Sequence, residues 1–161
     1  NMNLGLLDIE AAQGIGAAGA MLKVNADRIH AQASAGDVYL EISGSDEVLL
    51  EVQTREQGTI GIGAAQDLRL ATSSTLDATD LSLSAKRDLY LGGVRADGAL
   101  SLDAGRNMAL AGTFSGASLS LSSTAGTVSQ AAGSSLSSSG ATVLSAGNGA
   151  VLNLTFEEAA L

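Results

Sequence analysis

The chain has 161 residues, of which 45% are hydrophobic but only 2% aromatic, and it contains no proline, tryptophan or cysteine. The lack of cysteine excludes a disulfide scaffold and cysteine-ligated metal centres, and a net charge of −9 disfavours nucleic acid and anionic membranes as partners. No apolar run reaches the roughly 18–20 residues that cross a bilayer, so direct membrane insertion is not expected. The aliphatic composition favours a narrow, regular interior.

The first pattern along the chain is a glycine motif. Residues 14–19 read Gly-Ile-Gly-Ala-Ala-Gly, a formal match to the dinucleotide-binding fingerprint. That fingerprint needs a buried strand before it and a helix after it, whereas residues 7–13 alternate as a half-buried strand does and residues 20–24 are also strand-like. We therefore interpret the glycines as turn residues and expect no cofactor. His30, the only histidine, falls at an outward strand position and is interpreted as a surface residue, with no metal site expected.

A phrase then recurs along the chain: a small residue, a two-residue turn, Asp or Asn, and an alternating apolar strand. Its clearest copies occupy residues 34–40, 64–70, 85–92 and 104–111. The spacing is near 20 residues, except for 30 residues between Asp37 and Asp67. We expect Asp37, Asp67, Asp88 and Asn107 to occupy one equivalent turn. Asp and Asn favour turns because they bond the backbone of their own turn; a calcium ladder is the alternative, since calcium prefers oxygen ligands.

The irregular segment at residues 43–57 is expected to be an insertion or a longer coil. It is acidic and amphipathic, and insertions on repeat arrays often bind partners. Used for recognition, it would present Asp46, Glu47, Glu51, Arg55 and Glu56. Elsewhere the acidic residues are scattered and the aromatic residues number four, so glycoside hydrolysis is not supported and no enzyme activity is expected.

A second phrase keeps the same period: Leu-Ser-Leu-Ser-Ala at 81–85 recurs as Leu-Ser-Leu-Asp-Ala at 100–104 and as Leu-Ser-Leu-Ser-Ser at 119–123. Alternation over about five residues is the period of a strand with one buried face. Both phrases together predict an all-β parallel β-solenoid of about seven coils of 19–23 residues with one longer coil. Its interior columns are expected to contain Leu81, Leu83, Leu89, Leu100, Leu102, Met108, Leu119, Leu121 and Val128, with Ser82, Ser101 and Ser120 outside. Residues 155–161 are a possible capping tail.

The phrases at residues 81–93 and 100–112 resemble the haemagglutinin repeats that build the shafts of filamentous-haemagglutinin-like bacterial exoproteins. The resemblance is clearest over residues 58–154. It implies a right-handed parallel β-helix, an extracellular or cell-surface location, two-partner secretion, and a role in adhesion or biofilm. Residues 1–161 would then form one β-helix segment, a fragment of a longer repetitive protein.

The expected function is therefore a structural shaft segment of a bacterial adhesin. Two alternatives stay open. The first is a binding module that uses residues 41–57 to contact a host or bacterial surface glycan or protein. The second is a self-assembling filament or matrix subunit, because the open ends of a solenoid expose strand edges that invite stacking.

Overall fold

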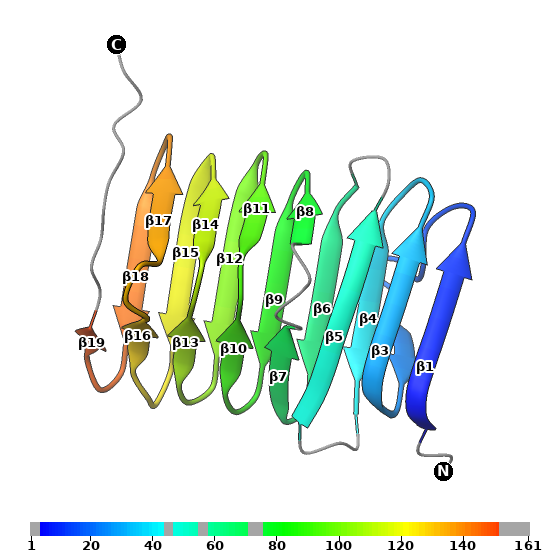
Figure 1. Cartoon of the computed structure of the whole chain (residues 1–161), viewed down its shortest axis with the longest axis horizontal. Coiled ribbons are helices and arrows are strands. Elements are labelled where there is room, and N and C mark those ends of the chain that lie inside the picture. Colours follow the sequence, from blue (N-terminus) through cyan, green and yellow to red (C-terminus); the bar gives the residue numbers. More distant parts are fainter. Residues whose placement is uncertain (1–3, 44–46, 55–57, 71–75, 152–161) are drawn as a thin grey trace.

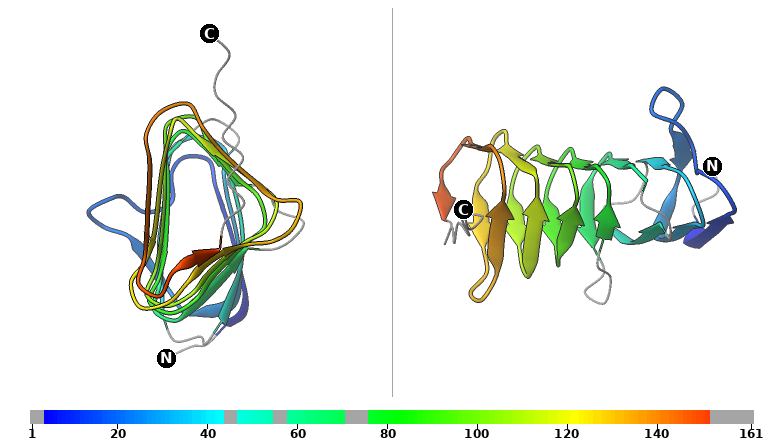
Figure 2. Two further views of the ribbon diagram at one scale, coloured as in Figure 1. Left: turned by 90° about the vertical axis from the view of Figure 1, so that its left-hand side faces the viewer. Right: turned by 90° about the horizontal axis from the view of Figure 1, so that it is seen from above.

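The chain forms a right-handed parallel β-solenoid, and the predicted fold class is confirmed. A computed structural model describes residues 4–43, 47–54, 58–70 and 76–151, in which every regular element is a strand. About six turns stack along one axis, close to the seven expected. In Figure 1 the strands in front point upward and those behind point downward, and Figure 2 shows the closed outline of the coil.

Three sheets make up the sides of the solenoid. Sheet A has eight strands, in spatial order β1 (Leu4–Ala11), β3 (Ala26–Ala33), β5 (Glu47–Thr54), β7 (Asp67–Leu70), β10 (Leu89–Leu91), β13 (Met108–Leu110), β16 (Val128–Gln130) and β19 (Ala150–Val151). Sheet B has seven, β18 (Thr142–Ala146), β15 (Ser118–Ser123), β12 (Ala99–Ala104), β9 (Leu81–Ala85), β6 (Ile60–Ala64), β4 (Val38–Ile42) and β2 (Leu22–Val24). Sheet C has four, β17 (Ser135–Ser138), β14 (Thr113–Gly116), β11 (Val94–Ala96) and β8 (Leu76–Ala78).

The cross-section changes along the axis. The first three strands of sheet A are eight residues long, and each leads directly to sheet B. From β7 onward the strands of sheet A are short, and a strand of sheet C forms a third side. Glycines lie at these later corners, where Gly112 and Gly133 have φ values of +102° and +81°. Such values suit glycine because it has no Cβ to clash, so glycine permits the sharp bend at these two corners.

The interior consists of aligned aliphatic columns, as the two phrases predict. Leu102 pairs in register with Leu83 on one side and Leu121 on the other. On sheet A, Met108 pairs with Leu89 and Val128 in the same way. All nine residues expected in the interior are buried, with exposed fractions of 2% or less. Each such side chain contributes about 1.5–3 kcal/mol before entropy is subtracted, so the columns supply most of the stability.

The outer face of sheet B follows the same register. Ser82, Ser101 and Ser120 are aligned on neighbouring strands and point away from the core. One large aromatic ring departs from the aliphatic pattern: Phe114 is fully buried in sheet C, between Val94 and Leu136.

Candidate functional site

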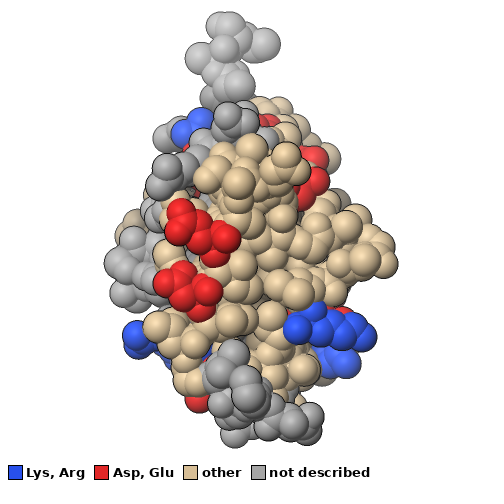
Figure 3. All heavy atoms as spheres, turned by 90° about the vertical axis from the view of Figure 1, so that its right-hand side faces the viewer, with Lys and Arg blue, Asp and Glu red and all other residues tan. Residues whose placement is uncertain are grey.

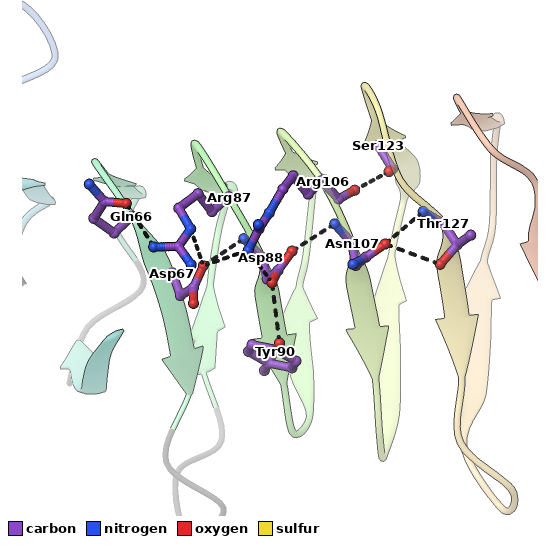
Figure 4. Close-up of polar contacts among 9 residues, drawn as sticks. All are labelled: Gln66, Asp67, Arg87, Asp88, Tyr90, Arg106, Asn107, Ser123 and Thr127. Carbon is purple, nitrogen blue, oxygen red and sulfur yellow. Dashed lines mark hydrogen bonds and ion pairs between the residues drawn. The ribbon is translucent and has the colours of Figure 1, made fainter. Parts of the chain in front are cut away.

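The most ordered polar feature is a ladder of hydrogen bonds at the corner that leads into sheet A (Figure 4). The Oδ1 atom of Asp67 accepts a bond of 3.0 Å from the backbone N–H of Asp88. Asp88 accepts one of 3.0 Å from Asn107, and Asn107 accepts one of 3.1 Å from Thr127. The sequence predicted that these side chains would bond their own turn. They bond the following turn instead. The backbone N–H groups of Asp88, Asn107 and Thr127 point toward the preceding turn, where the side-chain oxygen takes the place of a backbone carbonyl as their acceptor.

Asp88 is the electrostatic centre of this corner. It is 7% exposed, and its Oδ2 atom lies 2.7 Å from Nη2 of Arg106 and 3.4 Å from the hydroxyl of Tyr90. Burial by itself raises the pKa of Asp88, but the N–H of Asn107, the Arg106 guanidinium and the Tyr90 hydroxyl together outweigh it and lower the pKa below 3.8. Burial first, and the nearby carboxylates second, raise the pKa of Tyr90 above 10.0. The carboxylate is therefore held ionised as a structural acceptor.

Asp37 does not belong to this column, which corrects the sequence prediction. Val38 pairs with Ile60, so Asp37 precedes sheet B, whereas Asp67 and Asp88 lie at the corner that leads into sheet A. Its Oδ1 accepts a bond of 2.8 Å from the N–H of Thr59. Asp80 repeats that geometry two turns later, with a bond of 2.8 Å from the N–H of Ala99. Sequence reasoning missed Asp80, although it precedes a Leu-Ser-Leu strand as Asp37 precedes Val-Tyr-Leu.

Within the segment expected to be an insertion or a longer coil, the described residues 47–54 form β5, a strand in register with its neighbours in sheet A. Leu50 of β5 pairs with Ile29 of β3 and with Leu70 of β7, so these turns are 21 and 20 residues long. The apparent spacing of 30 residues arose because Asp37 and Asp67 belong to different corners. Of the five residues proposed for recognition, Glu47 and Glu51 lie in β5, opposite Asp67 and His30 in the register. Asp46, Arg55 and Glu56 lie outside the described residues, as does the proposed capping tail.

The glycine motif forms a hairpin that projects from the coil, visible in Figure 2 as the blue loop beside the N-terminal turns. Ala17 and Ala20 exchange backbone hydrogen bonds of 3.1 and 2.9 Å, and Gly16 has a φ of +68°. Between this hairpin and the outer face of sheet B lies a groove of about 840 Å³. Its floor is formed by small residues such as Gly63, Ser82 and Ser84. The ring of Tyr39 covers Gly61, where a Cβ would come within 2.7 Å of a ring carbon.

A second, smaller groove of about 340 Å³ lies on the outer face of sheet A and the adjoining corner. Its lining includes Arg69, Tyr90, Ala109 and Gln130. The Arg69 guanidinium carbon lies 4.8 Å from the centroid of the Tyr90 ring, a cation–π contact. The groove exists because the outward-facing residue is a tyrosine on β10, whereas the residue paired with it on β13 is an alanine.

His30 lies on the outer face of sheet A, as expected. Its Nδ1 is 2.9 Å from Oδ1 of Asp8, on the neighbouring strand. Within the described ranges, no three His, Cys, Asp or Glu side chains are grouped as metal ligands. The corner carboxylates that a calcium ladder would use accept bonds from backbone N–H groups and arginines instead. In that same part of the chain, no helix has the length and apolarity needed to cross a membrane.

Comparison with known proteins adds no assignment: no protein-family model, curated protein or solved structure matches this chain. The resemblance to haemagglutinin repeats therefore stays a prediction from the sequence.

Proposed function

We propose that the chain is a structural shaft segment of a secreted or cell-surface bacterial adhesin and has no catalytic role. The observation that carries the proposal is the corner ladder, in which one turn is bonded to the next by side chains as well as by backbone. Asp88, the most buried acid of the described residues, serves this bonding and is not directed at a cleft. This use of charge fits a structural element better than an active site.

The dimensions support the same role. Eight strands of sheet A are separated by seven intervals of about 4.8 Å, so this stack alone measures roughly 34 Å. In repeat proteins each turn contacts mainly its neighbours, so length can be added without redesigning the core. A stack of this kind holds a distal recognition element at a fixed distance from its anchor.

Location is tested first, with antibodies against the chain applied to intact producing cells, to culture medium and to lysates. We expect labelling of intact cells or of the medium. Detection in the lysate alone would overturn the proposal.

The spacer role is tested by replacing residues 4–151 in the parent protein with an unrelated β-solenoid of equal length. A shaft segment predicts that surface adhesion and biofilm formation are retained, whereas a binding module predicts their loss. Deleting the same residues without replacement is the control for length.

Self-association through the C-terminal end is a second candidate, favoured by the charge distribution. No charged residue occurs between Asn107 and Leu154. The last strand of sheet B exposes Val143 by 60% and Leu144 by 37%. By contrast, the first strand of sheet A has exposed Asp8 and Glu10, and acidic and basic side chains are visible on the N-terminal end in Figure 3. Charges on an edge strand oppose pairing with another chain, and the C-terminal edge lacks them.

Sedimentation velocity over a wide range of protein concentration tests this candidate. Association that grows with concentration and is abolished by Val143→Lys supports it. A species that stays monomeric at every concentration contradicts it.

A further inference from the structure

We propose that Asn148, which precedes Gly149, is a site of spontaneous deamidation, and that the reaction loosens the last turn of the solenoid. The two residues lie in the exposed corner between β18 and β19. Three features of the corner point to this reaction: the glycine that follows the asparagine, a backbone N–H without an acceptor, and a side-chain amide that joins this turn to the preceding one. Such a modification is independent of the shaft role.

The reaction needs only the chain itself and water. The backbone nitrogen of Gly149 gives up its proton and attacks Cγ of Asn148, which closes a five-membered succinimide ring. The Cγ–Nδ2 bond breaks, and the amide nitrogen takes up the proton and leaves as ammonia. Water then cleaves one of the two C–N bonds of the ring: opening at Cγ gives aspartate, and opening at the backbone carbonyl carbon gives isoaspartate. No atom is oxidised or reduced, so no further reactant is required.

Glycine at residue 149 favours the attack because it carries no side chain beside the attacking nitrogen. Its φ is +105°, a value that other residues rarely adopt, so the shape of the corner itself calls for glycine here. No heavy atom lies within 4 Å of a Cβ built on Gly149, so the space around the residue is open. The corner therefore places after Asn148 the residue that hinders ring closure least.

The corner ladder ends just before Gly149. In the three preceding turns, the backbone N–H at this position is bound by an Asp or Asn side chain of the turn before. Because Val128 pairs with Ala150, Gly149 comes after Thr127 in the same column. The Thr127 hydroxyl is directed at the Oδ1 atom of Asn107, 3.4 Å away. Among the residues that the structure describes, the Gly149 N–H has no acceptor, so no hydrogen bond restrains the attacking nitrogen.

Asn107 provides a contrast within the same chain. The residue after it, Met108, has a buried side chain, and its N–H donates to the carbonyl of Thr127 at 2.8 Å. The side-chain oxygen of Asn107 is itself held by the N–H of Thr127 at 3.1 Å. Both the attacking nitrogen and the amide under attack are therefore restrained at Asn107, and it should remain unmodified while Asn148 reacts.

Deamidation removes a tie between the last two turns. The Nδ2 atom of Asn148 donates to the carbonyl of Ala125 at 2.6 Å, beside the bond of 2.8 Å from its backbone N–H to the carbonyl of Gly126. In either product an ionised carboxylate, which only accepts hydrogen bonds, replaces the amide that donated to Ala125. Isoaspartate also lengthens the backbone by one methylene group just before β19, which disturbs its register with β16. The last turn should therefore be held less firmly after the reaction.

The test is to incubate the purified chain at neutral and at mildly alkaline pH and to follow Asn148 and Asn107 by peptide mapping with mass spectrometry. Labelling with isoaspartyl methyltransferase measures isoaspartate. We expect aspartate and isoaspartate at Asn148, at a rate that rises with pH because the attacking nitrogen must lose its proton, while Asn107 stays an amide. Complete retention of the amide at Asn148, after a synthetic peptide of residues 145–151 has been fully converted, would overturn the proposal.

Thr127→Asp separates the effect of the free N–H from that of the local sequence, which stays the same around Asn148. The new carboxylate would offer Gly149 the acceptor that Asp88 offers Asn107. We expect deamidation to be about tenfold slower, because the bound N–H must first break its hydrogen bond. Thr127→Asn is the uncharged alternative if that variant lacks a native circular dichroism spectrum. Ser120→Asp, an outward position on sheet B, is the charge control and should leave the rate unchanged. Equal rates in the folded Thr127 variant and the native chain would contradict the role of the free N–H.

The effect on the last turn is measured by hydrogen exchange of peptides that contain β18 and β19, before and after incubation. In the native chain these amides should exchange faster as deamidation proceeds, since the turn opens more often. Asn148→Gln keeps an amide but closes the corresponding six-membered ring far more slowly, so its exchange should stay constant with time. Unchanged exchange in a fully deamidated native chain would overturn the loosening of the turn.

Discussion

The Oδ1 atom of Asp88 accepts a 3.0 Å hydrogen bond from the backbone N–H of Asn107, one turn further along the solenoid. The same carboxylate binds Arg106 through its other oxygen. One buried side chain thus accepts a hydrogen bond from the backbone of the next turn and pairs with the charge of an arginine. Its removal should therefore weaken both interactions.

Replacing Asp88 should therefore destabilise the protein according to how much of this bonding is lost. Asp88→Ala leaves the Asn107 N–H without its acceptor and should cost about 1–3 kcal/mol in the free energy of unfolding. Asp88→Asn keeps an oxygen for that N–H but loses the charge facing Arg106, so it should cost less. Urea denaturation of the two variants measures the difference. Equal costs would mean that the ion pair, and not the acceptor, dominates.

Stability should also fall in acid because of Asp88. Its pKa is lowered below 3.8 by folding, so the folded state binds fewer protons than the unfolded state. Its stabilising contribution is complete above the unfolded value and is lost as the pH falls through the folded value. Denaturation curves measured at a series of pH values below about 4 should show a steeper loss for the native protein than for Asp88→Asn. Identical slopes would contradict this assignment.

Inward and outward positions on β12 should differ sharply. Leu102→Asp places a carboxylate in a fully buried column between Leu83 and Leu121 and should cost several kcal/mol. Ser101→Asp lies on the outer face and should change stability by no more than about 0.5 kcal/mol. Thermal unfolding followed by circular dichroism measures both, and similar effects would reverse the assignment of the two faces.

Glycine at residue 105 is expected to be indispensable. A Cβ there would overlap the backbone carbonyl oxygen of Lys86 on the preceding turn, so Gly105→Ala should cost about 1–3 kcal/mol as overpacking does. Gly19→Ala is the matched control, because no atom lies within 4 Å of a Cβ at the tip of the hairpin. Chemical denaturation of the pair decides, and a stable Gly105→Ala would mean that the turns can separate.

Hydrogen exchange should show whether residues 47–54 form a paired strand of the solenoid or a protruding insertion. Because β5 is paired on both sides, with β3 and β7, its amides should exchange as slowly as those of β3. A protruding segment would exchange like the hairpin at residues 17–20. Mass spectrometry of peptides covering both regions provides the comparison.

The fold was predictable because the two repeated phrases carry both the strand period and the turn period. Leu83, Leu102 and Leu121 are each one turn apart in the sequence, so their alignment followed from the spacing alone. The placement of Asp37 was wrong because the two corners of a turn use the same chemistry, an acid before an alternating strand. Sequence spacing does not distinguish them, and this error generated the apparent insertion.

The grooves could not be predicted, since they depend on pairs of residues about 20 positions apart on the outer face. Tyr90 opens a groove only because Ala109 lies beside it, and nothing in either phrase marks that neighbour. Gln130 was detectable in principle, because it replaces a leucine of the preceding copies.

The corner ladder also has a direction: every accepting side chain lies on the earlier turn and every donating N–H on the later one. A finished turn consequently displays its acceptors before the residues that need them have left the ribosome. In folding that proceeds from the N-terminus, each new turn therefore meets side-chain acceptors that are already in place, while backbone N–H groups such as those of Leu68 and Leu89 receive their acceptors from the turn that follows.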